Sequence, residues 1–317
     1  MPNCPHAGSD TKKSWPLVIV QEVILRDASI QTPDGSLDAR QLNIFLKNDG
    51  QDIWDGTLEC QSLVLQSLQF GQGKAAFRTT GHQLEITNYS LVAGDGQITG
   101  TGKIFLQTPE QSTLRYKIQQ VPIKVLLPTK WPITLNGTVN GMGDYTGPLF
   151  TWQQGMAQGS LQLNGTKVSV LPFVEKLALL PPLQELLAAS LDEAKANYHY
   201  NKGSFNFTEI VLTKTQKISL QGKLAVSVNN ELDGTFKLGI PTGLLAVAPP
   251  LKEKIFTQEN DGFSWTDLKI SGTPEQIQED LTPRLVALSQ SEGGKVQDAI
   301  KQGIEKAGDL LNDWFKK

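Results

Sequence analysis

The stretch that decides the fold runs from Gly155 to Ile240. It contains the segment Gly159-Ser-Leu-Gln-Leu-Asn-Gly-Thr-Lys-Val-Ser-Val170, in which apolar and polar residues alternate as in a β-strand. An apolar, proline-interrupted segment at about 171–194 follows and predicts two short helices. Two alternating segments, Ile218–Val228 and Leu232–Ile240, predict antiparallel strands at its end. The stretch therefore predicts a strand, a helical insert and a run of antiparallel strands.

Each of these strands has one apolar and one polar face, because successive strand residues point to opposite sides of a sheet. Glycines recur in the apolar phase, at Gly100, Gly102, Gly137, Gly222 and Gly234. A glycine within a strand marks a bend or a close approach, and on the inner face it lets the sheet curl around that face. Such a sheet either fills with side chains or stays open as an apolar trough. Few large residues point inward, so we expect a partly open trough.

The rest of the chain repeats the strand pattern, with about fifteen short strands separated by turns at roughly 8–12-residue spacing. Ile123–Leu127 and Ile133–Val139 are predicted strands, Pro241–Ile255 is predicted to be mostly irregular with at most one short helical turn, and Glu275–Ser291 is predicted to be a weak helix. The predicted fold is mainly β: an elongated, curled antiparallel sheet that forms an open groove or a partial barrel.

The predicted organisation has four parts. Residues 1–14 are polar and rich in proline and glycine, and we expect a disordered tail. Residues 15–150 form β-groove repeats up to a glycine-rich loop, and residues 151–290 form a second β region that carries the helical insert. Residues 291–317 are predicted to form an amphipathic helix, with apolar residues at three-to-four spacing.

Composition excludes several functional classes. The 29 Lys and Arg residues nearly balance 32 Asp and Glu residues in this chain of 317 residues, and no basic cluster indicates a nucleic-acid partner. The three histidines are far apart, and the two cysteines lack metal-ligand spacing. Cys60 is expected to be a buried thiol, and Cys4 an unpaired residue of the tail. The alternative is a Cys4–Cys60 disulfide. No catalytic motif occurs, so we predict a non-enzymatic protein with no catalytic residues, metal or cofactor.

The N-terminal sequence gives no sign of a targeting segment. Residues Met1 to Lys13 lack an apolar run, so we do not expect a signal peptide. The apolar residues Leu17–Val20 are far fewer than the roughly 20 that cross a membrane.

Several motifs together resemble the C-terminal region of AsmA-like proteins. These are Gly159-Ser-Leu-Gln-Leu-Asn-Gly, the apolar helical insert, Leu220-Gln-Gly-Lys-Leu, Leu232-Asp-Gly-Thr-Phe, and Leu268-Lys-Ile-Ser-Gly-Thr-Pro-Glu. The resemblance covers residues 80–290. It implies a relative of repeating β-groove, bridge-like lipid-transfer proteins, with the body in the periplasm of diderm bacteria and an anchor in the inner membrane. This sequence departs from that pattern because it contains no apolar run long enough for the anchoring helix, and we expect either a trimmed or an anchorless member.

We therefore expect a lipid-binding, lipid-transfer or envelope-homeostasis protein whose partner is a phospholipid or another acyl-chain ligand. The alternative is a structural or secretion-system component of the envelope that binds protein partners, as yet unknown, through β edges. The residues predicted to line a lipid groove share the apolar phase of their strands: Ile98, Ile104, Leu106, Leu161, Leu163, Ile218, Leu220, Leu224, Val226, Phe236 and Leu238.

Two helical segments leave alternatives open. The insert at 171–194 is predicted to be either a lid or a stopper of the trough. The C-terminal helix either packs on the parent sheet or binds a membrane surface through Trp314 and Phe315, although its polar face is nearly charge-balanced.

Overall fold

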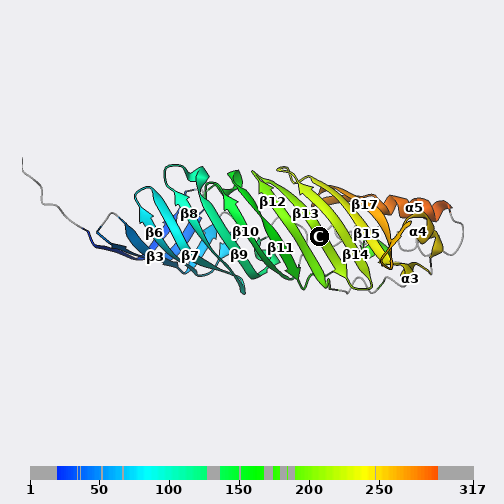
Figure 1. Ribbon diagram of the computed structural model, residues 1–317, viewed down its shortest axis with the longest axis horizontal. Coiled ribbons are helices and arrows are strands. Elements are labelled where there is room, and N and C mark those ends of the chain that lie inside the picture. The colour runs from blue at the N-terminus through cyan, green and yellow to red at the C-terminus, as the bar shows by residue number, and fades with distance from the viewer. Residues whose placement is uncertain are drawn as a thin grey trace, which may run out of the picture.

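The protein is elongated, and strands cross its long axis from one end to the other (Figure 1). The computed structural model describes residues 20–33, 35, 37–50, 53–65, 68–126, 136–149, 151–167, 174–178, 184, 190–246 and 248–291. The predicted tail at 1–14 and the amphipathic helix predicted at 291–317 lie outside these residues, except for Ser291. Within them, the chain forms one antiparallel sheet that curls without closing into a barrel, as the sequence predicts.

The strands of the sheet have the following bounds: β1 Glu22–Gln31, β2 Leu37–Asn48, β3 Trp54–Cys60, β4 Ser62–Leu65, β5 Leu68–Phe70, β6 Gly73–Thr80, β7 Gln83–Ala93, β8 Gly96–Phe105, β9 Thr113–Pro122, β10 Thr138–Thr146, β11 Met156–Asn164, β12 Glu193–Asn201, β13 Ser204–Lys214, β14 Ile218–Val226, β15 Leu232–Pro241, β16 Gln258–Asn260, β17 Phe263–Thr273 and β18 Gln276–Glu279. The helices are short: α1 Ile123–Leu126, α2 Val174–Leu177, α3 Thr242–Leu245, α4 Pro249–Lys254 and α5 Leu281–Ser291, with 3₁₀ turns η1 Pro109–Gln111 and η2 Trp152–Gln154.

Strand order follows chain order almost throughout. The main ladder runs β1-β2-β3-β6-β7-β8-β9-β10-β11-β12-β13-β14-β15-β17, and every pairing is antiparallel. Strand β4 pairs with the first residues of β2 and, on its other side, with β5. Strands β16 and β18 pair with the two ends of β17. The domain boundary predicted near residue 150 lies in the connection from β10 to β11, and these strands pair along their whole length.

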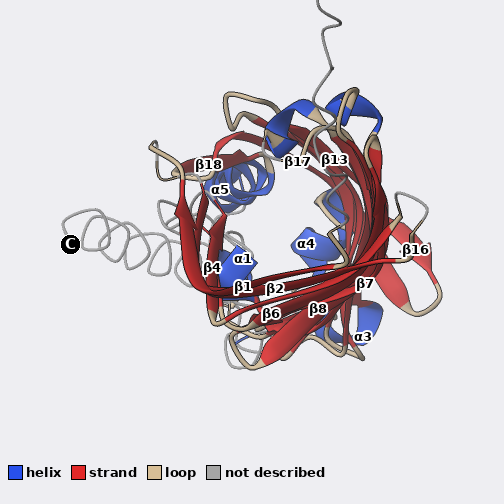
Figure 2. Ribbon diagram, turned by 90° about the vertical axis from the view of Figure 1, so that its left-hand side faces the viewer, coloured by secondary structure: helices blue, strands red, loops and turns tan. Residues whose placement is uncertain are grey.

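The curl of the sheet coincides with bulges inside its strands. The register shifts in β1, β9 and β13, next to Asp27, Gln120 and Glu209, which are non-glycine residues with positive φ. A bulge adds a residue to one strand, bends it and increases the local twist. Seen along the molecule, the sheet wraps around α1, α4 and α5 (Figure 2).

The C-terminal end of the curl is filled by the main hydrophobic core. Buried residues of β14, β15 and β17, such as Leu220, Leu238 and Leu268, pack with Leu251 of α4 and Leu285 of α5. In α5 the buried residues recur at three-to-four spacing, which is the pattern of a helix with one apolar face. The helices thus close this end of the sheet.

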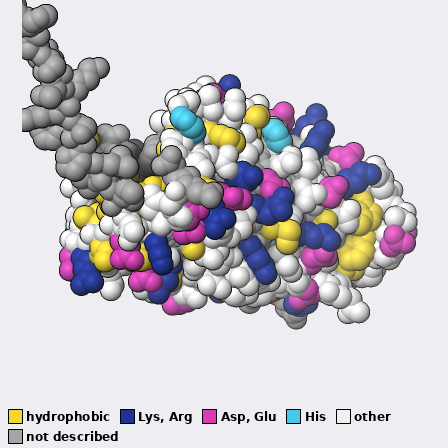
Figure 3. Space-filling model, turned by 60° about the vertical axis from the view of Figure 1, so that its left-hand side comes forward, with side chains coloured by type: hydrophobic (Ala, Val, Ile, Leu, Met, Phe, Trp, Pro, Cys, Tyr) yellow, Lys and Arg dark blue, Asp and Glu magenta, His cyan; other side chains and the backbone are white. Residues whose placement is uncertain are grey.

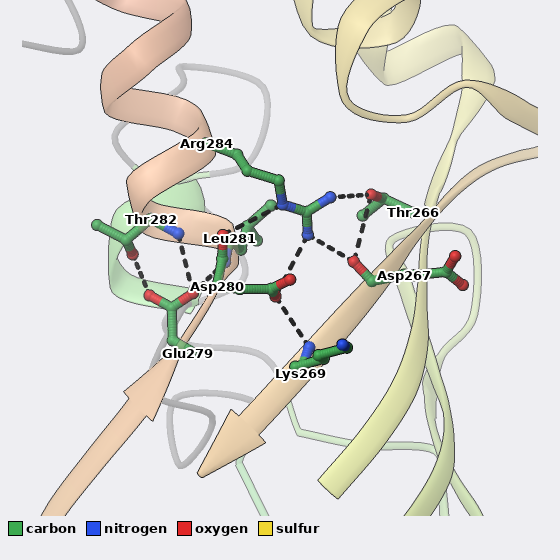
Figure 4. A network of polar contacts seen from close by, with 8 residues as sticks. All are labelled: Thr266, Asp267, Lys269, Glu279, Asp280, Leu281, Thr282 and Arg284. Carbon is green, nitrogen blue, oxygen red and sulfur yellow. Dashed lines mark hydrogen bonds and ion pairs between the residues drawn. The ribbon is translucent and has the colours of Figure 1, made fainter. Parts of the chain in front are cut away.

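Helix α5 is tied to the sheet by Arg284 (Figure 4). Its guanidinium donates to the Thr266 hydroxyl at 2.8 Å and to the Asp267 carbonyl at 2.5 Å, both in β17. The Asp280 carboxylate accepts from the backbone N–H of Lys269 at 2.8 Å. Glu279 accepts from the first N–H groups of the helix, which lack partners within the helix. Polar contacts therefore fix where the helix begins.

A second, smaller core lies under α1. Ile123 of this helix packs with Phe70, Ala93, Val121 and Val139, which come from strands on both sides of the sheet's middle. The sequence prediction of a strand at Ile123–Leu127 is wrong over the described residues, because Ile123–Leu126 turns inward as a helix and covers this part of the concave face.

Other local predictions also need correction. The insert predicted at about 171–194 is helical at α2, but Glu193 already begins β12. Segment Pro241–Ile255 contains α3 and α4, because its leucines pack into the main core. Residues 276–279 are strand β18, and the predicted helix begins only at Leu281. Gly137 precedes β10 with a φ of 116°, so it serves a turn rather than the inner face.

Candidate functional site

The concave face carries an apolar row across the middle of the whole ladder, which we call the central row. Each member lies directly opposite the next on the neighbouring strand, so all point to the same side of the sheet. From β1 to β17 the central row is Leu25, Ile44, Leu58, Ala75, Tyr89, Gly100, Tyr116, Gly143, Gly159, Tyr198, Phe207, Leu224, Gly234 and Ile270. At about 4.8 Å between strands, thirteen spacings give a path of about 60 Å.

A second apolar row, the rim row, runs beside the central row near the strand ends. Its members are Val23, Leu46, Gly56, Phe77, Ile86, Gly102, Leu114, Tyr145, Ala157, Tyr200, Phe205, Val226, Leu232 and Gly272. No charged residue occurs in either row. The two rows form a continuous apolar band along the concave face.

The convex face is charged. Cross-strand ion pairs link Lys74 with Glu59 at 3.1 Å and Arg78 with Asp55 at 2.8 Å, and Arg115 with Asp144 at 3.0 Å. Basic and acidic side chains are interspersed over the surface in Figure 3. Because exposed pairs of this kind contribute little to stability, their main effect is to keep this face in water. The sheet therefore separates a charged outer surface from an apolar inner one.

Glycine and tyrosine shape the middle of the central row. Tyr89 lies against Gly100, where an added Cβ would sit 2.8 Å from the tyrosine ring. Tyr116 and Tyr198 extend toward each other over Gly143 and Gly159, and their hydroxyls hydrogen-bond. The rings lie along the sheet because the glycines leave room for them. These aromatic rings therefore line this part of the groove without filling it.

All five tyrosines of the protein belong to these two rows. Burial raises the pKa of each phenol, to about 12 for Tyr145 and above the usual range for Tyr89, Tyr116, Tyr198 and Tyr200. The Tyr145 hydroxyl donates to the Pro148 carbonyl, and that of Tyr200 to the Gln153 carbonyl. These groups are neutral hydrogen-bond donors at physiological pH, so the band carries no charge there.

The band is half-buried near both ends of the sheet, since Phe207, Leu224 and Ile270 match its N-terminal members. Toward the N-terminal end, Ile44, Leu58, Phe77 and Ile86 are half-buried, so their apolar atoms still reach solvent. At the C-terminal end the concave residues next to the band are covered by the helices. The sequence allowed either a filled or an unfilled trough. The structure contains both, because the trough is unfilled toward β1 and filled near α3, α4 and α5.

The predicted lipid-groove residues divide between these states. Ile98, Ile104, Leu161, Leu163 and Leu224 are half-buried on the concave face. In contrast, Ile218, Leu220, Val226, Phe236 and Leu238 are less than a tenth exposed, and all but Val226 belong to the main core.

Leu106 differs from both groups. It follows the end of β8 and is 56% exposed, so it is neither half-buried nor covered by the helices. Sequence periodicity gives the correct face for the strand residues but does not show which of them the helices cover. Sequence periodicity also missed the aromatic members of the two rows. They could have been found from the tyrosine and phenylalanine residues that alternate with polar neighbours in their strands.

A cavity of about 600 Å³ opens at the ends of β13, β14, β15 and β17. Phe205, Val226 and Leu232 of the rim row contribute its apolar lining, and Glu231 and Asp233 stand among its polar residues. An apolar interior with a polar edge suits an amphiphilic molecule.

Two further findings concern the described residues only. No group of three or more histidine, cysteine, aspartate or glutamate side chains there could hold a metal ion. Cys60 is a free, buried thiol, and burial raises its pKa; Cys4 lies outside the described residues.

No helix in the described part of the chain has the length and apolar character needed to cross a membrane. Comparisons with protein-family models, with curated proteins and with solved structures find no match to this chain. The resemblance to AsmA-like proteins stays a prediction.

Proposed function

We propose that this protein binds the hydrocarbon chains of lipids along its concave face and acts as a non-enzymatic lipid carrier or conduit. The observation that supports this most is the continuous apolar band of the central and rim rows, which stays half-exposed over the N-terminal strands. Exposed apolar surface of this extent usually marks a binding site. The resemblance to AsmA-like proteins points to the same function and would place it in the cell envelope.

The geometry suits a long, flexible and uncharged chain. Each methylene removed from water contributes about 0.8 kcal/mol, so the affinity is expected to grow with chain length. A headgroup would stay at the polar edge of the groove, because the two rows offer no charged partner for it. The five tyrosines are neutral, and the hydroxyls of Tyr116, Tyr145, Tyr198 and Tyr200 already hydrogen-bond within the protein.

The first experiment measures lipid that co-purifies with the protein. The chain is expressed in a diderm bacterium, purified without detergent and extracted for mass spectrometry. We expect stoichiometric amounts of acyl-chain lipid. Protein that is lipid-free and also fails to take up a fluorescent fatty acid would contradict the proposal. A stoichiometric protein partner in place of lipid would favour the structural alternative.

Matched variants then test the concave face. Leu58 lies in the central row and is half-buried, whereas its neighbour Thr57 in β3 is exposed on the convex face. Leu58→Asp should reduce bound lipid several-fold, while Thr57→Asp should leave it unchanged. Both variants add one negative charge to the same strand. Equal lipid content in the two variants would exclude binding along the band.

A second pair tests the region near the closed end. Leu224→Asp acts on the central row, and Gln221→Asp is its convex control in β14. Leu220, another residue that the sequence predicts to line the groove, is 1% exposed inside the main core. An aspartate there is expected to unfold this end of the sheet, so it cannot report on lipid binding.

A further inference from the structure

Strand β1 forms a free edge of the sheet. Among the described residues it pairs with β2 alone. Four of its apolar side chains are exposed: Val23 41%, Ile24 53%, Leu25 43% and Ile30 46%. The strand contains no proline or lysine, and the features that could oppose edge-to-edge pairing are the charges of Arg26 and Asp27 and the bulge beside them. Its unpaired backbone and apolar surface are therefore suited to receive another strand.

The apolar band of the concave face runs up to this edge. Val23 and Leu25 lie opposite Leu46 and Ile44, and Ala28 and Ile30 lie opposite Leu42 and Ala39. The bulge at Asp27, whose φ is 51°, inserts one residue and keeps both pairs on the same face. At the opposite end of the molecule the band meets the helices, whereas here it ends at an exposed strand.

We infer that β1 pairs antiparallel with β1 of a second copy of this chain, about a two-fold axis between Arg26 and Asp27. In this register Val23 meets the second copy's Ile30, and Leu25 meets its Ala28. Arg26 meets the second copy's Asp27, and the symmetry repeats each contact. Among the described residues neither the Arg26 guanidinium nor the Asp27 carboxylate makes an ion pair, while the Asp27 backbone N–H donates to Asn43 Oδ1 of β2 at 3.2 Å.

Self-complementarity favours a second copy over an unrelated strand. Opposite charges and apolar pairs match simultaneously, as a two-fold interface requires. Two strands that pair antiparallel in this way keep the concave faces of both copies on the same side of the joined sheet. The two apolar bands would therefore join, and the helix-covered end of each copy would lie at an outer end of the dimer. The dimer rests on the edge strand alone. The consequence that it doubles the length of a lipid groove rests on the proposed function.

Charge reversal tests the register. Arg26→Asp or Asp27→Lys places like charges opposite each other and should weaken the dimer at least about tenfold in sedimentation equilibrium of the full chain. The combined variant Arg26→Asp/Asp27→Lys restores opposite charges and should return the dissociation constant to within about threefold. Lysine adopts a similar positive φ elsewhere in this chain, at Lys202 with a φ of 46°. A monomeric wild-type chain, or a double variant no better than the singles, overturns the inference.

Disulfide trapping gives a second readout. In a Cys4→Ser background, Val23→Cys/Ile30→Cys should form an intermolecular disulfide, because directly opposite Cβ atoms lie about 4.5–5.5 Å apart. Ile24→Cys/Ile30→Cys puts the thiols on opposite faces and should not. Equal cross-linking of both variants, or of neither, overturns the register.

Lipid content of the Arg26→Asp variant separates the two proposals. A monomer that still carries lipid supports both the groove and the charge contact. A dimer without lipid contradicts the proposed function alone, and a monomeric wild type that carries lipid contradicts the dimer alone.

Discussion

The hydroxyl of Tyr116 in β9 hydrogen-bonds the hydroxyl of Tyr198 in β12, although two strands separate them. The intervening residues of the central row are Gly143 and Gly159. A Cβ at Gly159 would lie 2.7 Å from the Tyr198 hydroxyl, and one at Gly143 would lie 2.9 Å from the Tyr116 hydroxyl. The two rings can therefore lie along the sheet only because both positions lack side chains.

The first prediction concerns these glycines. Gly159→Ala should destabilise the protein by about 1–3 kcal/mol, because the methyl group meets the Met142 carbonyl and the Tyr198 hydroxyl in a packed site. The free energy of unfolding in urea measures this. Gly81→Ala is the control, since nothing lies within 4 Å of a Cβ at that position. Equal stability of both variants would show that the rings move away easily.

The second prediction concerns the tyrosines. The pKa of all five phenols is raised in the folded protein, first of all by burial. Absorbance at 295 nm should therefore show less phenolate at pH 10 in the folded state than in unfolded chains, which titrate at about 10. Their contribution to stability is complete below about pH 10 and is lost as pH rises through the folded pKa values, which is about 12 for Tyr145.

Urea-unfolded protein is the control for this titration, because its five tyrosines have no burial. A folded protein in which several tyrosines ionise with a midpoint near 10 would show that the central and rim rows are freely hydrated. Bound lipid would bury the rings further, so delipidated protein is the form to measure.

The third prediction concerns the closure of the C-terminal end. Arg284→Met removes the hydrogen bonds to the Thr266 hydroxyl and to the carbonyls of Asp267 and Asp280, and it leaves the Asp267 carbonyl with only a 3.5 Å contact from the Thr266 hydroxyl. We expect a loss of about 1–3 kcal/mol, because a hydrogen bond from a charged group is replaced by none. Hydrogen exchange of the amides in Leu281–Ser291 should become faster, while β7 and β8 keep their protection.

Gln290→Ala is the matched control on the same helix. Gln290 is exposed, and alanine favours a helix, so exchange should not increase there. If Arg284→Met exchanges no faster than this control, apolar packing of Leu281, Leu285 and Leu288 is sufficient to hold α5.

Local features predicted much of the fold correctly. The alternation in Ile218–Val228 and Leu232–Ile240 identified β14 and β15 and their apolar faces, since the two-residue period of a strand depends only on neighbouring residues. The inward glycines Gly100, Gly102, Gly222 and Gly234 do lie on the concave face under aromatic or leucine side chains. Predictions failed where tertiary packing decides, as at Ile123–Leu126, whose apolar residues suit either a strand or a helix.

The sequence by itself determined that this protein is a mainly β chain with one apolar and one polar face per strand, and with glycines that allow a curl. Only the tertiary structure decided that Tyr116, Gly143, Gly159 and Tyr198 share one row, because strand register joins residues far apart in the chain. It also decided that Leu220 is covered by helices while Leu58 is half-exposed, since burial depends on which element packs above a side chain.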